Sequence, residues 1–329
     1  MNTSLIKNHL KNIIDNWFNK HCEELSTNAV FCHQRYNTKQ YDFPEDSIET
    51  DIDSNYELQL QEKYLEVEYK EKLKKSIIVS GGCITSLFLN EDVNDYDIYF
   101  TDKTVISVII KYYLNIFNKH NDTDWHWSEK YNCIYKLKHD IFTEEEFIEH
   151  FYDYVEITDA ISAHNVSDVP NKYIPICITP NAISLTNGIQ LITRFTGTPE
   201  EILSNFDFIH TNNYYLYHEN KLITNHKAIE SILTKQLIYN GSKYPICSMI
   251  RTRKFIKRGW NISAGEYLKM AFQLQELDLY NIQTLREQLI GVDAKYFIKF
   301  LEELKTLKEL TNKNIFNLLN NIFEEVGDE

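Results

Sequence analysis

The sequence predicts an α+β protein, in which a mixed sheet with flanking helices is followed by a helical C-terminal domain. Ile77-Ile78-Val79 is a β-branched run of the kind that forms a buried strand, and residues 188–195 show an equally clear strand pattern. From Ala228 onward, apolar residues recur at helical spacing almost to the end, with breaks at 240–242 and near Gly291. A chain of 329 residues is long enough to bury the cores of both parts.

The remaining elements are predicted from local patterns. Helices are expected at 5–25, 57–75 and 105–117, a short helix at 198–201, and strands at 133–137, 205–217 and 221–223. Residues 144–156 mix helix and strand signals. The acidic segment 34–55 and the polar, proline-containing segment 157–188 are predicted to form loops.

Composition limits the class of function. The net charge of −14 argues against broad, sequence-blind binding to nucleic acid, although it leaves room for a local basic groove. No run approaches the roughly 18 uninterrupted apolar residues that span a bilayer, and the N-terminus lacks the features of a signal peptide, so no membrane partner is expected. The six cysteines are scattered without a Cys-x-x-Cys pair, which favours a reducing, cytoplasmic location.

One short motif carries the chemistry: Ser80-Gly81-Gly82, then twelve residues, then Asp95-Tyr96-Asp97. The glycines let the backbone turn sharply and approach a bulky ligand. The two aspartates stand at i and i+2 of a predicted strand, so both carboxylates point the same way. Such a pair binds hard divalent cations and can bridge two of them during in-line phosphoryl transfer. The alternative is an ordinary turn and a solvated strand face.

This motif resembles that of the nucleotidyltransferase superfamily, which includes DNA polymerase beta, poly(A) polymerases, CCA-adding enzymes and bacterial nucleotidyltransferase toxins. The resemblance covers about residues 76–260 and is specific only between the glycines and the aspartates. It implies that Ser80, Gly81 and Gly82 cradle the triphosphate of an NTP, while Asp95 and Asp97 hold two Mg²⁺ ions. The overall pattern is also similar to phage-encoded nucleotidyltransferase-like proteins.

The patterns along the chain predict three parts, in an architecture that the resemblance also implies. Residues 1–75 would form N-terminal helices and an acidic loop, residues 76–225 a catalytic domain with an insertion at about 101–188, and residues 226–329 a helical domain.

Many superfamily members use a third acidic residue, on a neighbouring strand, to position the attacking hydroxyl. Asp207 is the first candidate, because it lies between two phenylalanines of a predicted strand and its side chain would face away from the core. In that position it would be both a catalytic residue and a metal ligand. Glu156 and Asp159 are the competing carboxylates, and His210 is a candidate proton acceptor.

The order of features in residues 189–215 is similar to a segment of bacterial CCA-adding enzymes, but two departures stand out. Thr85-Ser86 occurs where those enzymes have Arg-Asp, and Asn205-Phe206 occurs where they have paired arginines. The base-reading template is therefore not visible, and the resemblance indicates the superfamily without the subfamily.

Residues 251–258 concentrate five positive charges in an acidic protein. On a helix, Arg251, Lys254 and Arg258 fall at i, i+3 and i+7 and share one face. Such a face would offset charge on the β and γ phosphates of a bound nucleotide. The alternative is a solvated helix face paired with nearby acids such as Glu266.

The sequence therefore predicts a Mg²⁺-dependent nucleotidyltransferase that transfers NMP from an NTP to an acceptor hydroxyl. The expected acceptor is RNA, in particular a tRNA 3′ end. One alternative is transfer to a protein or small molecule, as in toxin-like members. Another is a catalytically inactive binding or virion-associated protein.

Overall fold

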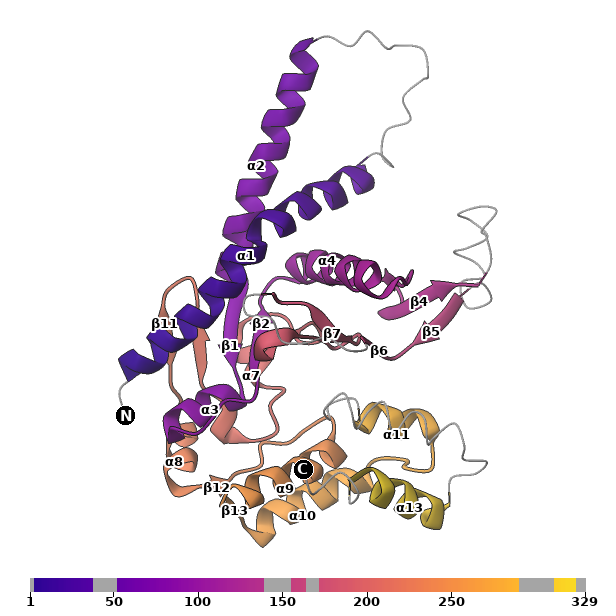
Figure 1. Cartoon of the computed structure of the whole chain (residues 1–329). Coiled ribbons are helices and arrows are strands. Elements are labelled where there is room, and N and C mark those ends of the chain that lie inside the picture. Colours follow the sequence, from indigo (N-terminus) through magenta and orange to yellow (C-terminus); the bar gives the residue numbers. More distant parts are fainter. Residues whose placement is uncertain (1–2, 38–51, 139–154, 164–171, 290–310, 324–329) are drawn as a thin grey trace. The chain divides into compact units, whose positions relative to one another are not determined.

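The computed structural model describes residues 3–37, 52–138, 155–163, 172–289 and 311–323 (Figure 1). The chain divides into two compact units. The first comprises Met1–Cys83, Asp92–Pro199 and Tyr214–Ile223, and the second comprises Ile84–Glu91, Glu200–Asn213 and Thr224–Glu329. The predicted acidic loop falls largely at 38–51, outside the described residues.

The first unit is built on an eight-stranded sheet in the order β11-β10-β1-β2-β9-β8-β7-β6. The strands are β1 (Ile77–Ser80), β2 (Tyr96–Phe100), β6 (Ile161–Ser162), β7 (Pro175–Ile178), β8 (Ala182–Leu185), β9 (Ile189–Ile192), β10 (Tyr214–Leu216) and β11 (Lys221–Ile223). Neighbouring strands pair antiparallel except β2 and β9, which are parallel. The predicted mixed sheet is therefore confirmed.

The sheet has one strongly apolar face. Directly paired residues on neighbouring strands point to the same face. One such row consists of Val79, Ile98, Leu191, Ile183 and Ile178, and each of these side chains is fully buried. Val79, the last residue of the β-branched run before the glycine turn, belongs to this row, and its burial stabilises the sheet.

Helices α1 (Thr3–Asn37), α2 (Ile52–Ser76) and α4 (Lys103–Asn121), labelled in Figure 1, belong to the first unit. The Trp17 ring of α1 contacts Phe100, which shares a face of β2 with Ile98. The Trp17 indole Nε1 also donates a hydrogen bond to the Tyr113 hydroxyl of α4 at 2.8 Å, and both side chains are fully buried. The helices predicted in these three regions are confirmed, and each is longer than expected.

The prediction of a loop at 157–188 is wrong, because this segment contributes β6, β7 and β8 to the main sheet. These strands are only two to four residues long, too short to show a clear alternation. Pro175 stands at the first position of β7, where a proline is tolerated in a sheet. A separate three-stranded sheet contains β3 (His126–Ser128), β4 (Cys133–Leu137) and β5 (Val155–Thr158).

The second unit is mainly helical, as predicted. Its elements are α7 (Pro199–Leu203), α8 (His226–Thr234), α9 (Pro245–Lys257), α10 (Ala264–Gln275), α11 (Ile282–Leu289), α13 (Asn312–Phe323), the 3₁₀ turn η3 (Ile209–Thr211) and the strand pair β12 (Gln236–Leu237) and β13 (Asn261–Ile262). α3 (Gly82–Leu89) starts in the first unit and continues in the second. Among the described residues, none of the helices has the length and apolar content needed to cross a membrane.

The substitution Tyr113→Phe tests the link between α1 and α4. It leaves the buried indole Nε1 of Trp17 without its acceptor, so the free energy of unfolding should fall by about 1–3 kcal/mol. Urea unfolding measures the loss. The same chemical change at the exposed Tyr267 is the control and should cost less than about 0.5 kcal/mol; equal losses would contradict the assignment.

Candidate functional site

The glycine turn lies between β1 and α3, as the sequence predicts. β1 ends at the fully buried Ser80, Gly81 follows with φ of +94°, and α3 begins at Gly82. The antiparallel pairing of β1 and β2 places Ser80 directly opposite Asp97. The turn and the second aspartate are therefore neighbours on one face of the sheet.

Gly81 and Gly82 have different structural reasons to be glycine. A Cβ atom on Gly81 would lie 2.9 Å from the Asp97 Oδ2 atom, and its positive φ is unfavourable for any other residue. A Cβ atom on Gly82 would have no atom within 4 Å. Gly81 is thus required by the position of the Asp97 carboxylate, whereas Gly82 borders open space.

Asp95 is exposed and immediately precedes β2. Its backbone packs against Gly188 at the start of β9: a Cβ atom on Gly188, whose φ is +67°, would lie 3.1 Å from the Asn94 carbonyl oxygen. Between the two aspartates, Tyr96 is held by α1 through a hydrogen bond of 2.5 Å between its hydroxyl and His9 Nε2. The sequence signal for the contact between Gly188 and the backbone of Asn94 is the Asn-Gly pair at 187–188, just before a strand.

The sheet register brings Gln190 to the site, a residue that sequence reasoning missed. Gln190 of β9 is the direct partner of Asp97, and Ser184 of β8 is the direct partner of Gln190. Gln190 Nε2 donates a hydrogen bond to Ser184 Oγ at 3.2 Å. The two strand neighbours of Asp97 are therefore Ser80 and Gln190, and neither is acidic.

The donor set of this face suits a magnesium ion. Asp95 and Asp97 offer carboxylate oxygens and Gln190 offers an amide oxygen, which are hard ligands of the kind that Mg²⁺ takes alongside water and substrate phosphates. At Gly81 there is no side chain to occupy the space beside the Asp97 carboxylate. Within the described ranges, no group of three or more His, Cys, Asp and Glu residues is arranged to hold a metal.

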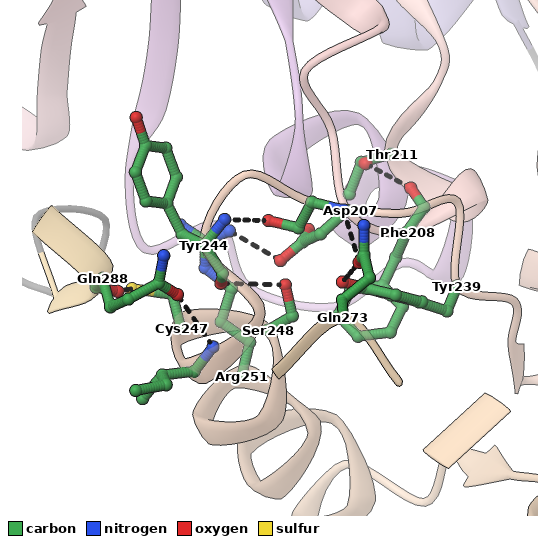
Figure 2. A network of polar contacts seen from close by, with 12 residues as sticks. Asp207, Phe208, Thr211, Tyr239, Tyr244, Cys247, Ser248, Arg251, Gln273 and Gln288 are labelled. Carbon is green, nitrogen blue, oxygen red and sulfur yellow. Dashed lines mark hydrogen bonds and ion pairs between the residues drawn. The ribbon is translucent and has the colours of Figure 1, made fainter. Parts of the chain in front are cut away.

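Asp207 belongs to the second unit, and the predicted strand around it is wrong. The chain forms a bend there, because the Phe206 amide bonds back to the Leu203 carbonyl at 3.0 Å, and β10 begins only at Tyr214. Asp207 is only 6% exposed and accepts a hydrogen bond from Arg251 Nη1 at 2.8 Å (Figure 2). Asp207, predicted as a metal ligand, and Arg251, predicted to bind phosphate, thus form an ion pair with each other.

Arg258 is also paired with a carboxylate of the chain. It follows the last residue of α9, and its guanidinium donates to Glu91 through Nε at 3.1 Å and to Ser86 Oγ through Nη2 at 3.0 Å. Lys235 Nζ reaches the other Glu91 oxygen at 3.1 Å. Burial opposes ionisation of Glu91, but these hydrogen bonds hold its pKa below the usual value. Lys254, the third residue of the predicted basic face, is exposed.

Thr85 and Ser86, which replace the Arg-Asp pair of CCA-adding enzymes, make contacts within the second unit. Thr85 Oγ1 donates to the His210 carbonyl at 3.1 Å, and Ser86 accepts from Arg258. These two positions therefore connect α3 to η3 and to the end of α9.

The remaining candidates belong to other elements than the aspartate strand. Glu156 lies in β5 of the separate three-stranded sheet, and Asp159 follows the end of that strand. His210 is fully buried, with ring centroids 4.5 Å from Phe255 and 4.6 Å from Trp260. Burial lowers its pKa to about 3, with Asp207 opposing and Arg258 adding to the shift. Such a group is a poor proton acceptor at neutral pH.

The fold is α+β, and its mixed sheet presents an Asp-x-Asp strand beside a strand–glycine turn–helix unit, the arrangement that the sequence predicts. The model of the Gabija anti-defense 2 (Gad2) family matches residues 55–235, so the chain belongs to this family. A curated relative, Gabija anti-defense 2 of Bacillus phage SPbetaL7, is 24% identical over 257 residues, or 76% of this chain and 51% of the relative. The matched part of the chain thus corresponds to about half the length of that relative.

Solved structures of CCA-adding and tRNA-processing enzymes are distantly similar. A tRNA-processing enzyme with CTP is 12% identical, with a TM-score of 0.37, covering 79% of this chain and 57% of that one. A CCA-adding enzyme with ATP is 11% identical, with a TM-score of 0.37 and coverages of 85% and 64%. The Thermotoga maritima CCA-adding enzyme complexed with tRNA is 11% identical, with a TM-score of 0.33 and coverages of 79% and 51%. Similarity this distant carries no argument about the ligands or activity of this chain.

The pair Gly81→Ala and Gly82→Ala tests the contact between the turn and Asp97. Gly81→Ala should cost about 1–3 kcal/mol in the free energy of unfolding, because the new Cβ meets the carboxylate in a backbone conformation unfavourable for alanine. Gly82→Ala, at an open position, should change it by less than about 0.5 kcal/mol. Urea unfolding compares the two, and similar values for both would refute the distinction.

The substitution His210→Phe tests the burial of a neutral histidine. With a folded-state pKa of about 3 against about 6.5 when unfolded, His210 binds its proton first in the unfolded state as the pH falls. This group should therefore lower the free energy of unfolding by about 1.4 kcal/mol between about pH 7.5 and 5.5. The His210→Phe variant has no such group, so its free energy of unfolding, measured by urea titration at both pH values, should fall by about 1.4 kcal/mol less than that of the wild type. A pH dependence identical to that of the wild type would disprove the expectation.

Proposed function

We propose that this chain is a Mg²⁺-dependent nucleotidyltransferase that binds an NTP at the turn between β1 and α3 and transfers NMP to an acceptor hydroxyl. The observation that carries the proposal is the fit of Gly81 against the Asp97 carboxylate, with Ser80 in register beside it. A glycine that makes room for a carboxylate at the start of a helix provides backbone donors and an anionic metal ligand in one place.

Each group of the site has a chemical task in this proposal. The backbone of Ser80, Gly81 and Gly82 would bind triphosphate oxygens, and Asp95 and Asp97 would hold Mg²⁺. Bound magnesium would neutralise charge that develops on the transferred phosphoryl group. The acceptor oxygen would bond to the α-phosphorus while the bond to the β-phosphate bridge oxygen breaks, releasing pyrophosphate and passing the hydroxyl proton to solvent.

RNA, and in particular a tRNA 3′ end, is the proposed acceptor. This choice rests on the resemblance of the motif to RNA-modifying members of the superfamily. Protein or small-molecule acceptors are the alternatives that the labelling experiment below distinguishes.

The family suggests the biological setting. The curated relative carries the name Gabija anti-defense 2 and comes from a phage. We therefore propose that this chain acts against Gabija defence in the host cytoplasm, and that its nucleotide site serves this action.

A second candidate function is nucleotide binding without transfer. Two observations favour it: neither strand neighbour of Asp97 is acidic, and the buried Asp207 is ion-paired with Arg251. Such a protein would hold the nucleotide and act through binding alone.

Asp97→Asn and Asp95→Asn test the proposed reaction. The protein is incubated with Mg²⁺ and each α-³²P-labelled NTP, with and without total RNA. Wild-type protein should label RNA, and both variants should reduce labelling by about 100-fold or more, because they remove the charge that holds the metal. The exposed Asp92, in the same loop but outside the strand, provides the matched control: Asp92→Asn should label RNA at the wild-type rate.

The other outcomes assign the function differently. Label on protein supports the toxin-like alternative, and NTP binding without label supports the second candidate. If the wild type neither binds nor transfers an NTP, and Asp97→Asn protects a phage from a Gabija-carrying host as well as wild type does, the nucleotide site has no role and the proposal fails.

A further inference from the structure

We propose that Gln190 is the third residue of the nucleotide site, where its amide oxygen, oriented by Ser184, binds the magnesium–nucleotide complex in place of a carboxylate. This inference rests on the proposed nucleotide site and specifies its ligand: an NTP that arrives with its cation, at a site with two carboxylates and one neutral amide.

The sheet register places Gln190 beside the aspartates. β9 is the parallel neighbour of β2, and Gln190 is the direct partner of Asp97 across it. Residues paired in this way have their Cβ atoms roughly 5 Å apart on the same face. The flanking Ile189 and Leu191 are buried on the opposite, apolar face, so Gln190 is the β9 side chain nearest to the aspartate strand on this side.

The orientation of the amide is fixed by a second strand. Gln190 Nε2 donates to Ser184 Oγ at 3.2 Å, and Ser184 is itself the direct partner of Gln190 on β8. Because the nitrogen is used in this hydrogen bond, the amide oxygen Oε1 is the atom that the side chain presents to a ligand. A positioned acceptor oxygen next to a carboxylate is suited to a hard cation.

The surrounding pattern sets this face apart from the other. The row that contains Asp97 runs through Ser80, Asp97, Gln190, Ser184, Cys177 and Ser162, whereas the neighbouring row on the opposite face is wholly aliphatic from β1 to β7. Ser80 is fully buried and Cys177 is nearly so. On the β9 side of the aspartate strand, the polar side chains of this row are Gln190 and Ser184.

The neutral amide changes what the site binds. A carboxylate adds a full negative charge to a cation site, whereas an amide oxygen adds only a dipole. With two carboxylates, the site should bind free Mg²⁺ weakly and acquire it with the phosphates of the nucleotide. An amide also cannot accept the proton of an acceptor hydroxyl, so in the proposed reaction that proton passes to solvent.

Gln190→Glu and Gln190→Ala test the inference by binding, independently of any transfer. The full chain is titrated calorimetrically with the α,β-methylene analogue of each NTP, at a series of free Mg²⁺ concentrations. Gln190→Ala should weaken binding of the magnesium–nucleotide complex about tenfold, since an oxygen ligand is lost. Gln190→Glu should lower the Mg²⁺ concentration for half-maximal binding about tenfold, since a carboxylate is gained.

Two further variants separate a site role from a general effect. Ser184→Ala releases the amide and should weaken binding about threefold or more, because the oxygen is no longer held in place. Gln236→Glu makes the same chemical change on the exposed β12 residue of the second unit and should bind as the wild type does. Thermal unfolding checks that each variant is folded.

The failures of the two proposals are distinguishable. If Asp97→Asn abolishes binding while both Gln190 variants bind within about twofold of the wild type, the Gln190 inference is overturned and the nucleotide site stands. If the wild-type protein binds none of the analogues at any Mg²⁺ concentration, the proposed function and this inference both fail.

Discussion

The close approach of Gly81 to the Asp97 carboxylate is the constraint on which the site depends. Antiparallel pairing of β1 and β2 sets Ser80 opposite Asp97, so the next residue must turn away from the sheet directly over a charged side chain. A Cβ atom there would lie 2.9 Å from the Asp97 Oδ2 atom, and the observed φ of +94° is one that glycine adopts readily. The beginning of α3 and the open space beside Gly82 both follow from this turn.

The second constraint is the contrast between two neighbouring rows of side chains on opposite faces of the sheet. The aliphatic row from Val79 to Ile178 provides the buried area that holds the strands together, and it lies one residue out of phase with the polar row. Each strand of this region therefore contributes one side chain to the core and the next one to the opposite face. This explains how Gln190 can stand between two buried aliphatic neighbours and still serve a polar site.

The sequence was sufficient for features that are encoded locally. A β-branched run, two glycines and an Asp-x-Asp strand are adjacent in the chain, so the strand–turn–helix–strand unit was predictable, and so were the helices with clear apolar spacing. Gln190 was not predictable as a neighbour of Asp97, because their pairing joins strands separated by the whole segment from 101 to 188. The environment of Asp207 was not predictable for a related reason: its flanking phenylalanines suggest a strand, but its buried side chain pairs with Arg251, 44 positions later.

The turn before β9 has a consequence for how this chain can change. Asn187 and Gly188 both have positive φ values, and Gly188 rests against the Asn94 backbone, so the chain enters β9 at a fixed point. If β9 began one residue earlier or later, Leu191 or Ile189 would lie beside the aspartates, and Gln190 would be buried in the aliphatic core. The segment between Phe100 and this turn can therefore vary in length and composition only if it returns to Gly188 in phase. Gly188 therefore fixes the register of β9 whatever the length of the segment that precedes it.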